Sequence, residues 1–311
     1  RQMSRGFGAR TELAGAFQFQ LTTKSGVALA DMVKEVKDAI KEFATKGVSD
    51  DDIEKFKASY EAQTIYGLES VSGKVSRLAS FQTFTGNANY IKNELERYNK
   101  ITKADVIRVY NQYIKDKPMV ILSVTPKGSE MLKAGEDNYT VSQQGYTAPD
   151  YGYNNLKYKK ATDKFDRNKM PAAGANPVIK VPKYKQIEVD GMKMLSVHSD
   201  ELPVVVISIG LKGGRLAEQN DLSKAGVAQL FSAMMDEDTK LHSAEEFSVL
   251  LDKLGSSISF GTDIDETGVT VRCLKKNLEA TLDLLDERLL QPKFTQEAFD
   301  RIKSQKIESI R

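Results

Sequence analysis

Residues 203–214, PVVVISIGLKGG, decide the fold class of the second half of the chain. An aliphatic run of this length that ends at two glycines is typical of a strand buried in a sheet. A hairpin is predicted just before it, because Asp190 and Gly191 form a turn pair between two short apolar runs. The stretch therefore indicates a sheet built from neighbouring, mainly antiparallel strands.

Helices and further strands are predicted after this stretch. Ser223 is expected to cap one helix, and Ser243 with Glu246 forms a capping box for the next. Two short strands and two more helices follow, at residues 256–260, 268–274, 276–290 and from 296 onward. We therefore predict that residues 184–311 form an α+β domain, with a mainly antiparallel sheet packed on helices.

The first 125 residues predict a second domain of the same class. Residues 16–22 alternate apolar and polar side chains, as in a half-buried strand. Capping boxes at Ser49 and at Thr102 open two of the helices expected between residues 29 and 113. Residues 119–124 are apolar except for Ser123 and include three β-branched residues, and we predict that they form a buried strand. Residues 6–8, Gly-Phe-Gly, are expected to form a turn.

Residues 126–183 differ in composition from both flanking parts. Lysine, tyrosine, glycine, asparagine and proline dominate there, and hydrophobic periodicity is lost. Loops of this length are uncommon inside a compact domain, so the segment is predicted to link the domains at 1–125 and 184–311. Its tyrosines are expected to pack on the domain surfaces.

Composition excludes several classes of partner. The chain of 311 residues has 45 basic and 43 acidic side chains, and this balance favours neither nucleic acid nor an anionic membrane surface. No apolar run is long enough to span a bilayer. Cys273 is the single cysteine, which excludes a disulfide framework and a cysteine zinc cage. Because the sequence starts without methionine and ends within an expected helix, we expect it to be part of a longer protein.

The order of several short motifs resembles the pitrilysin/insulinase family of zinc peptidases. In the first half they are residues 47–57, 68–70 and 101–106, and in the second half 191–193, 203–205, 213–218, 225–228 and 290–294. Residues 166–167, 170–171 and 181–182 resemble the junction between the two repeats of bacterial members. The resemblance implies four similar α+β domains in the whole protein. It places this chain from within the second domain into the third, in the bacterial periplasm or cytoplasm.

The family's catalytic motif is degenerate in this sequence. The active domain carries His-x-x-Glu-His on a helix, where two histidines one turn apart bind zinc and the glutamate activates water. Gln229 stands at the first histidine, Ser232 at the glutamate and Ala233 at the second histidine. We therefore expect neither a catalytic residue nor a metal ligand here, and the resemblance implies that zinc is held in an upstream domain of the full-length protein.

Other chemistry-bearing residues favour structural roles. Glu308 falls where the family's third zinc ligand would lie, but one carboxylate cannot hold zinc alone, so it is expected to be a solvated helix residue. His198 and His242 lack acidic neighbours at ligand spacing and are expected to lie on a surface hairpin and in a loop. The acidic residues between 263 and 266 are expected at a hairpin end, and Cys273 in the core.

Together these features predict a non-catalytic segment that helps to enclose a peptide or unfolded protein while zinc chemistry occurs elsewhere. An edge strand is expected to hold extended substrate by main-chain pairing. One alternative is an inactive scaffold or partner subunit of the same family, in an oligomer. Another is a stand-alone peptide-binding module. An intact or a degenerate motif upstream of Arg1 distinguishes the first two, and peptide affinity of the isolated chain tests the third.

Overall fold

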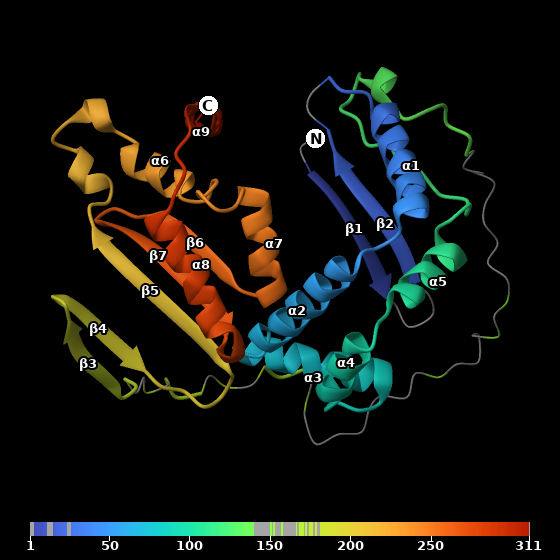
Figure 1. Ribbon diagram of the computed structural model, residues 1–311. Coiled ribbons are helices and arrows are strands. Elements are labelled where there is room, and N and C mark those ends of the chain that lie inside the picture. The colour runs from blue at the N-terminus through green and yellow to red at the C-terminus, as the bar shows by residue number, and fades with distance from the viewer. Residues whose placement is uncertain are drawn as a thin grey trace.

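The computed structural model describes residues 3–10, 15–23, 26–139 and 181–310, and isolated positions between 150 and 178. It consists of an N-terminal unit, residues 3–139, and a C-terminal unit, residues 181–310 (Figure 1). Both units combine helices with antiparallel strands, so the α+β class predicted from the sequence is confirmed. No helix in the described ranges is both long and apolar enough to cross a membrane.

The N-terminal unit is a β-hairpin followed by five helices. Strands β1 (Met3–Arg10) and β2 (Gly15–Thr22) pair in antiparallel register. The helices are α1 (Leu29–Lys46), α2 (Asp50–Tyr66), α3 (Val71–Thr85), α4 (Ile91–Asn99) and α5 (Lys103–Tyr113). Both predicted capping boxes are confirmed, with the Ser49 hydroxyl accepting from the Asp52 amide and the Thr102 hydroxyl accepting from the Asp105 amide.

Two predictions for this unit are wrong, and one helix was not predicted. Residues 6–8 do not form a turn, because they lie inside β1 and pair with β2. Residues 119–124 form no strand, and Val120 is 99% exposed. Helix α4 was not predicted, since its short run lacks a side-chain cap. Strand β2 is present as expected but is more exposed than half-buried, because Phe17 and Phe19 face an open groove.

The C-terminal unit holds a three-stranded sheet and a separate hairpin. The hairpin pairs β3 (Tyr184–Val189) with β4 (Met192–Val197), and the sheet has the order β5-β7-β6 from β5 (Val204–Lys212), β6 (Ser257–Thr262) and β7 (Glu266–Leu274). The helices are α6 (Val227–Met234), α7 (Ala244–Leu254), α8 (Leu278–Leu290) and α9 (Gln296–Ile310). Short 3-10 turns occupy η3 (Arg215–Glu218), η4 (Leu222–Lys224) and η5 (Lys275–Asn277).

The main core lies between this sheet and helices α7 and α8. Phe247 of α7 and Val271 of β7 are both fully buried, and Leu284 and Leu285 of α8 pack against them. Strand β7 is the central strand, and its alternate residues from Thr267 to Cys273 are buried. Cys273 lies on this inner face at 0% exposure, as predicted, and burial raises the pKa of its thiol.

Helix α2 joins the two units by packing on the end of α7. Ala62 is 1% exposed there, and the Tyr66 hydroxyl donates to the Gly255 carbonyl at 3.0 Å. The Arg272 guanidinium stacks 4.2 Å from the centre of the Tyr66 ring. Three ion pairs cross the same contact, namely Lys253 with Asp51, Arg272 with Glu69 and Lys276 with Glu61.

The two units also share one motif, a β-hairpin followed by two helices. It comprises β1, β2, α1 and α2 in the first unit and β6, β7, α8 and α9 in the second. Residues 49–57, at the start of α2, align without a gap to residues 295–303, at the start of α9. Thr295 caps α9 as Ser49 caps α2, since its hydroxyl accepts from the Ala298 amide at 3.2 Å. The two units thus share an element order over these segments.

Residues 126–183 fall largely outside the described residues, and so do four of the five tyrosines expected to pack on the domains. The fifth, Tyr139, is 80% exposed, so little of its surface is packed against the protein.

Candidate functional site on helix α6

Helix α6 carries the three positions that correspond to the zinc-peptidase motif. Gln229 is exposed to solvent, Ser232 is 5% exposed, and Ala233 is half-buried against the core formed by α6 and α9. The three side chains therefore do not converge on one open space. Among the residues that the structure describes, no group of three histidine, cysteine, aspartate or glutamate residues is placed to hold a metal ion. These residues do not fit a zinc ion.

Ser232 has a structural role instead of a catalytic one. Its hydroxyl lies 2.5 Å from that of Thr262 on β6, and both hydroxyls are within hydrogen-bond distance of the Ala228 carbonyl, at 3.1 and 2.9 Å. Thr262 also contacts the hydroxyl of Thr267 on β7 at 3.1 Å. A buried hydroxyl needs such partners because an unpaired one would lose its hydrogen bonds to water. Ser232 thus fastens α6 to the sheet.

Glu218 holds the start of α6, a role that the sequence analysis gave to Ser223. The carboxylate of Glu218 accepts hydrogen bonds from the amides of Ala228 and Gly226, both at 2.7 Å, and these bonds lower its pKa. Ser223 lies in η4, where its amide bonds to Asp221 instead. The predicted cap at Ser223 is wrong, because Gly226, at φ 94°, starts the helix three residues later.

His242 lies in the loop before α7, as predicted, but it has an acidic partner that sequence spacing did not reveal. Its Nδ1 lies 3.0 Å from Oε1 of Glu287, a residue of α8 that is only 7% exposed. The Thr239 hydroxyl donates to the same carboxylate. Next along α8, the buried Arg288 bonds to Asp236 at 3.0 Å, and desolvation lowers its pKa. These pairs tie the loop between α6 and α7 to α8.

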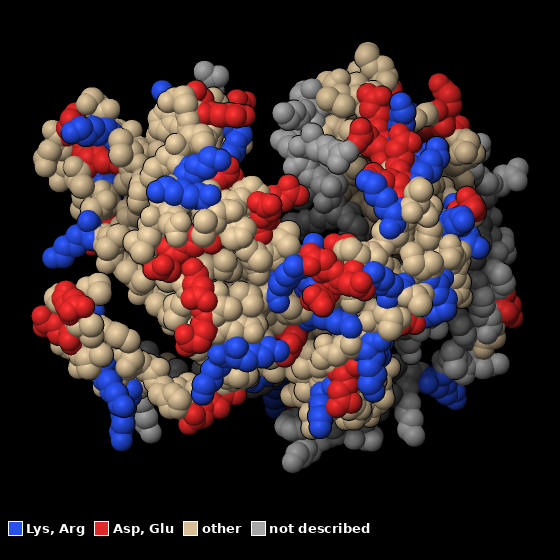
Figure 2. Space-filling model, viewed as in Figure 1, with Lys and Arg blue, Asp and Glu red and all other residues tan. Residues whose placement is uncertain are grey.

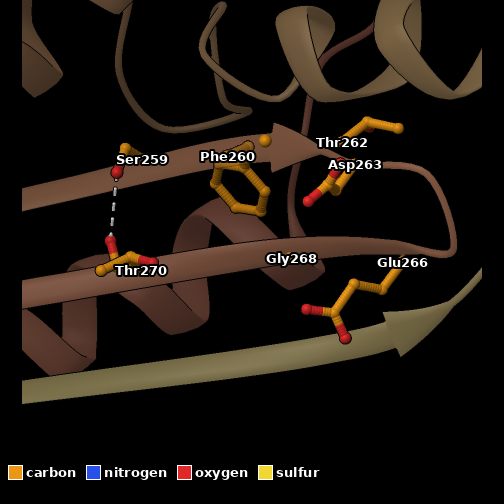
Figure 3. Close-up of a pocket in the computed structure, with 8 residues that line it drawn as sticks. Ser259, Phe260, Thr262, Asp263, Glu266, Gly268 and Thr270 are labelled. Carbon is orange, nitrogen blue, oxygen red and sulfur yellow. Dashed lines mark hydrogen bonds between the residues drawn. The ribbon is translucent and has the colours of Figure 1, made fainter. Parts of the chain in front are cut away.

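The remaining candidates lie on the surface. Glu308 is exposed on α9, and His198 is exposed beside Asp200, with 2.7 Å between Nε2 and Oδ1. Asp263 and Glu266 lie at the end of the β6–β7 hairpin, as expected, beside a shallow pocket on the outer face of the sheet (Figure 3).

This pocket is lined by small and polar residues. They are Ser259, Phe260, Gly261, Thr262, Asp263, Glu266, Gly268 and Thr270. The Ser259 hydroxyl donates across it to the Thr270 carbonyl at 3.4 Å, and the Glu266 carboxylate points toward β5 (Figure 3).

Acidic and basic side chains are interspersed over the face of the molecule in Figure 2.

The part of the chain that contains α6 is similar to a known protein family. Residues 193–311 match the family model "Insulinase (Peptidase family M16)". This segment is similar to the M16 family. The resemblance stated from the sequence is thereby confirmed for residues 193–311, which contain α6 together with the three strands β5, β6 and β7.

Individual relatives match a similar share of the chain. A Helicobacter pylori protein described as "Non-peptidase homolog YmxG" is 29% identical over 126 residues, which is 40% of this chain and 28% of the relative. The M16 inactive domain from Pseudomonas fluorescens is 25% identical over 40% of this chain and 30% of its own, with a TM-score of 0.37. A protease from Helicobacter pylori is 21% identical over 38% and 28%, with a TM-score of 0.34. The chain thus spans less than a third of the length of these relatives.

Proposed function

We propose that this chain is a non-catalytic part of an M16-type zinc peptidase that helps to enclose a peptide while the bond is cut in another domain of the full-length protein. The observation that carries the proposal is the state of α6. The helix lies within the M16 segment, yet Gln229 and Ala233 replace the metal-binding positions. Ser232, at the position of the general base, is bonded to Thr262 and the Ala228 carbonyl.

Zinc belongs, in this proposal, to a different domain of the full-length protein. There a metal-bound water would attack the peptide bond, with a glutamate as base. This chain would form part of the wall around the enclosed peptide and would present exposed strand edges to it. Strands β5 and β6 are the outer strands of their sheet, and such edges can pair with an extended peptide through main-chain hydrogen bonds.

A second candidate is an inactive scaffold or partner subunit. The Helicobacter pylori relative favours it, because that protein is described as a non-peptidase homologue. In this case the whole parent protein would lack zinc, and its role would be to assemble with an active subunit.

The deciding experiment compares residues 1–311 with the full-length protein. Zinc content and cleavage of an unfolded peptide are measured for both. We expect zinc and cleavage only in the full-length protein; zinc and cleavage in neither would favour the scaffold. Gln229→Ala is the matched control in each, because Gln229 is exposed and the change should leave the fold intact. Loss of zinc in that variant would show that α6 binds metal after all and would overturn the proposal.

A further inference from the structure

The sequence contains a single place where aspartate or asparagine precedes glycine, at Asp190 and Gly191. In such a pair the backbone amide nitrogen of the glycine can attack the side-chain carboxyl carbon of the aspartate and close a five-membered succinimide ring. A side chain on the following residue crowds that attack and restricts the backbone rotation that it needs, whereas glycine does neither. Asp190 is therefore the aspartate of this chain whose sequence most favours ring closure.

The structure places this pair at the tip of the β3–β4 hairpin. Val189 pairs with Met192, so Asp190 and Gly191 are the two turn residues, and they adopt φ 50° and φ 77°. Two-residue hairpin turns of type I′ need positive φ at both positions, which explains the glycine at the second. A Cβ at Gly191 would meet nothing within 4 Å, so no described part of the chain lies against this side of the turn.

Both reacting groups of the turn are free. Asp190 and Gly191 are exposed to solvent. Within the described ranges, the Gly191 amide donates to no acceptor, and the Asp190 carboxylate has neither a hydrogen bond nor an ion pair. Asp52 and Asp105, by contrast, are occupied in capping boxes. No bond of the reacting groups must therefore break before the ring closes.

In the described part of the chain, the hairpin that carries the turn is held by its own strand pairing alone. Strands β3 and β4 form a two-stranded sheet apart from β5, β6 and β7, and every residue of both strands is exposed (Figure 1). A two-stranded hairpin of this kind is marginally stable in water. Ring closure requires the backbone at Asp190 to rotate out of the turn conformation, and transient opening of the hairpin permits that rotation.

We propose that Asp190 is a site of spontaneous isomerisation to isoaspartate. The Gly191 nitrogen forms a bond to Cγ of the protonated Asp190 carboxyl group, the amide gives up its proton, and hydroxide leaves Cγ, so that one water molecule is released. A second water molecule then opens the succinimide. Addition at the main-chain carbonyl leaves the backbone running through Cβ and Cγ, which is isoaspartate, and addition at Cγ restores aspartate.

Isoaspartate adds one methylene group to the backbone at the turn. A two-residue turn sets the register of its hairpin, so the pairs Ile187–Met194 and Val189–Met192, which share one face, lose their alignment. The modified residue also carries a carboxylate on its Cα, which is the group that isoaspartyl methyltransferases recognise. The product is therefore distinguishable from aspartate both by its effect on the hairpin and by its chemistry.

Peptide mapping of the aged protein tests the proposal. Residues 1–311 are kept in warm, mildly acidic buffer and digested, and isoaspartate in each peptide is measured with an isoaspartyl methyltransferase and a labelled methyl donor. Asp265 is the internal control, because it is exposed at a hairpin end but precedes Glu266. We expect at least about tenfold more isoaspartate at Asp190 than at Asp265, since only glycine leaves the attack uncrowded. Equal amounts would overturn the proposal.

The variant Asp190→Asn tests the ring itself. Asparagine suits the same turn position, so the hairpin should be kept. It closes the same succinimide with loss of ammonia, which leaves at neutral pH without a protonated carboxyl group. Isoaspartate should therefore form faster at neutral pH in this variant than in the unchanged protein. No increase would show that the ring does not form at this turn.

The same incubation in urea measures how far the hairpin protects the turn. We expect the folded protein to react within about tenfold of the rate in urea, because a hairpin held by its own pairing opens readily. A folded-state reaction much slower than that would show that the turn is protected and would contradict the proposal. None of these results depends on the proposed peptidase role.

Discussion

Replacing Gly255 with alanine tests the contact that joins the two units. Gly255 follows α7 at φ 57°, a conformation that costs a residue with a Cβ about 1 kcal/mol or more. The new Cβ would also lie 2.6 Å from the Ala62 Cβ and 2.8 Å from the Ala58 carbonyl oxygen, both on α2. Because these atoms belong to a rigid helix, overpacking adds about 1–3 kcal/mol. The expected loss is therefore about 2–4 kcal/mol.

Gly86 offers a matched control for the backbone part of this cost. It ends α3 at φ 70°, and a Cβ there would meet nothing within 4 Å. Gly86→Ala should cost only about 1 kcal/mol. Urea denaturation followed by circular dichroism gives both free energies of unfolding. If the two variants differ by less than about 0.5 kcal/mol, α2 does not pack on Gly255 and the joining of the units is refuted.

Two further predictions concern a helix cap and the core. The Ser49 hydroxyl, and then Lys55, lower the pKa of Asp52 from 3.8 to about 2, so the stabilisation by this carboxylate is complete above about pH 4 and is lost as the pH falls toward 2. The melting temperature of Asp52→Asn should lie below that of the unchanged protein at pH 7 and converge with it near pH 2; a constant difference would contradict the assigned cause. Phe247→Ala should cost about 3–5 kcal/mol in urea denaturation because Phe247 is fully buried, whereas Phe294→Ala, at a 53% exposed site, should cost much less. Similar losses for both would show that the core is placed wrongly.

The helices and hairpins were predictable because their signals are local. The capping boxes at Ser49, Thr102 and Ser243 each involve two side chains three residues apart, and the structure contains all three. The Asp190-Gly191 turn likewise has both residues at positive φ, which favours that pair in a two-residue hairpin. Such features need no knowledge of the rest of the chain.

The errors arise where a distant partner decides the outcome. Residues 6–8 resemble a turn because two glycines flank Phe7, but pairing with β2 extends them. Glu218 caps α6 from eight residues before Gly226, beyond the spacing of any standard cap. Glu287 and His242 are far apart in sequence and meet only because α8 packs beside the loop. The signal available in the sequence was a pair of acidic residues, Glu218 and Asp221, before a helix that begins at a glycine.

The sequence predicted the candidate site only as three positions at which other residues replace those of the zinc motif. Gln229, Ser232 and Ala233 could be identified by alignment with a motif, whereas the role of Ser232 required Thr262 to be placed beside it. Thr262 lies 30 residues after Ser232 in the sequence, and only the fold brings the two hydroxyls together.

The opposite charges across the contact between α2 and the C-terminal unit should affect how rigid that contact is. Asp51, Glu61 and Glu69 lie on one side, and the basic residues that pair with them lie on the other. Exposed pairs contribute about 0–1 kcal/mol each and weaken with salt, since the Debye length is about 8 Å at physiological ionic strength. The apolar packing of Ala62 is not an interaction between charges and is not screened in this way. Ionic strength should therefore tune the stiffness of this joint, while the surfaces that meet in it stay the same.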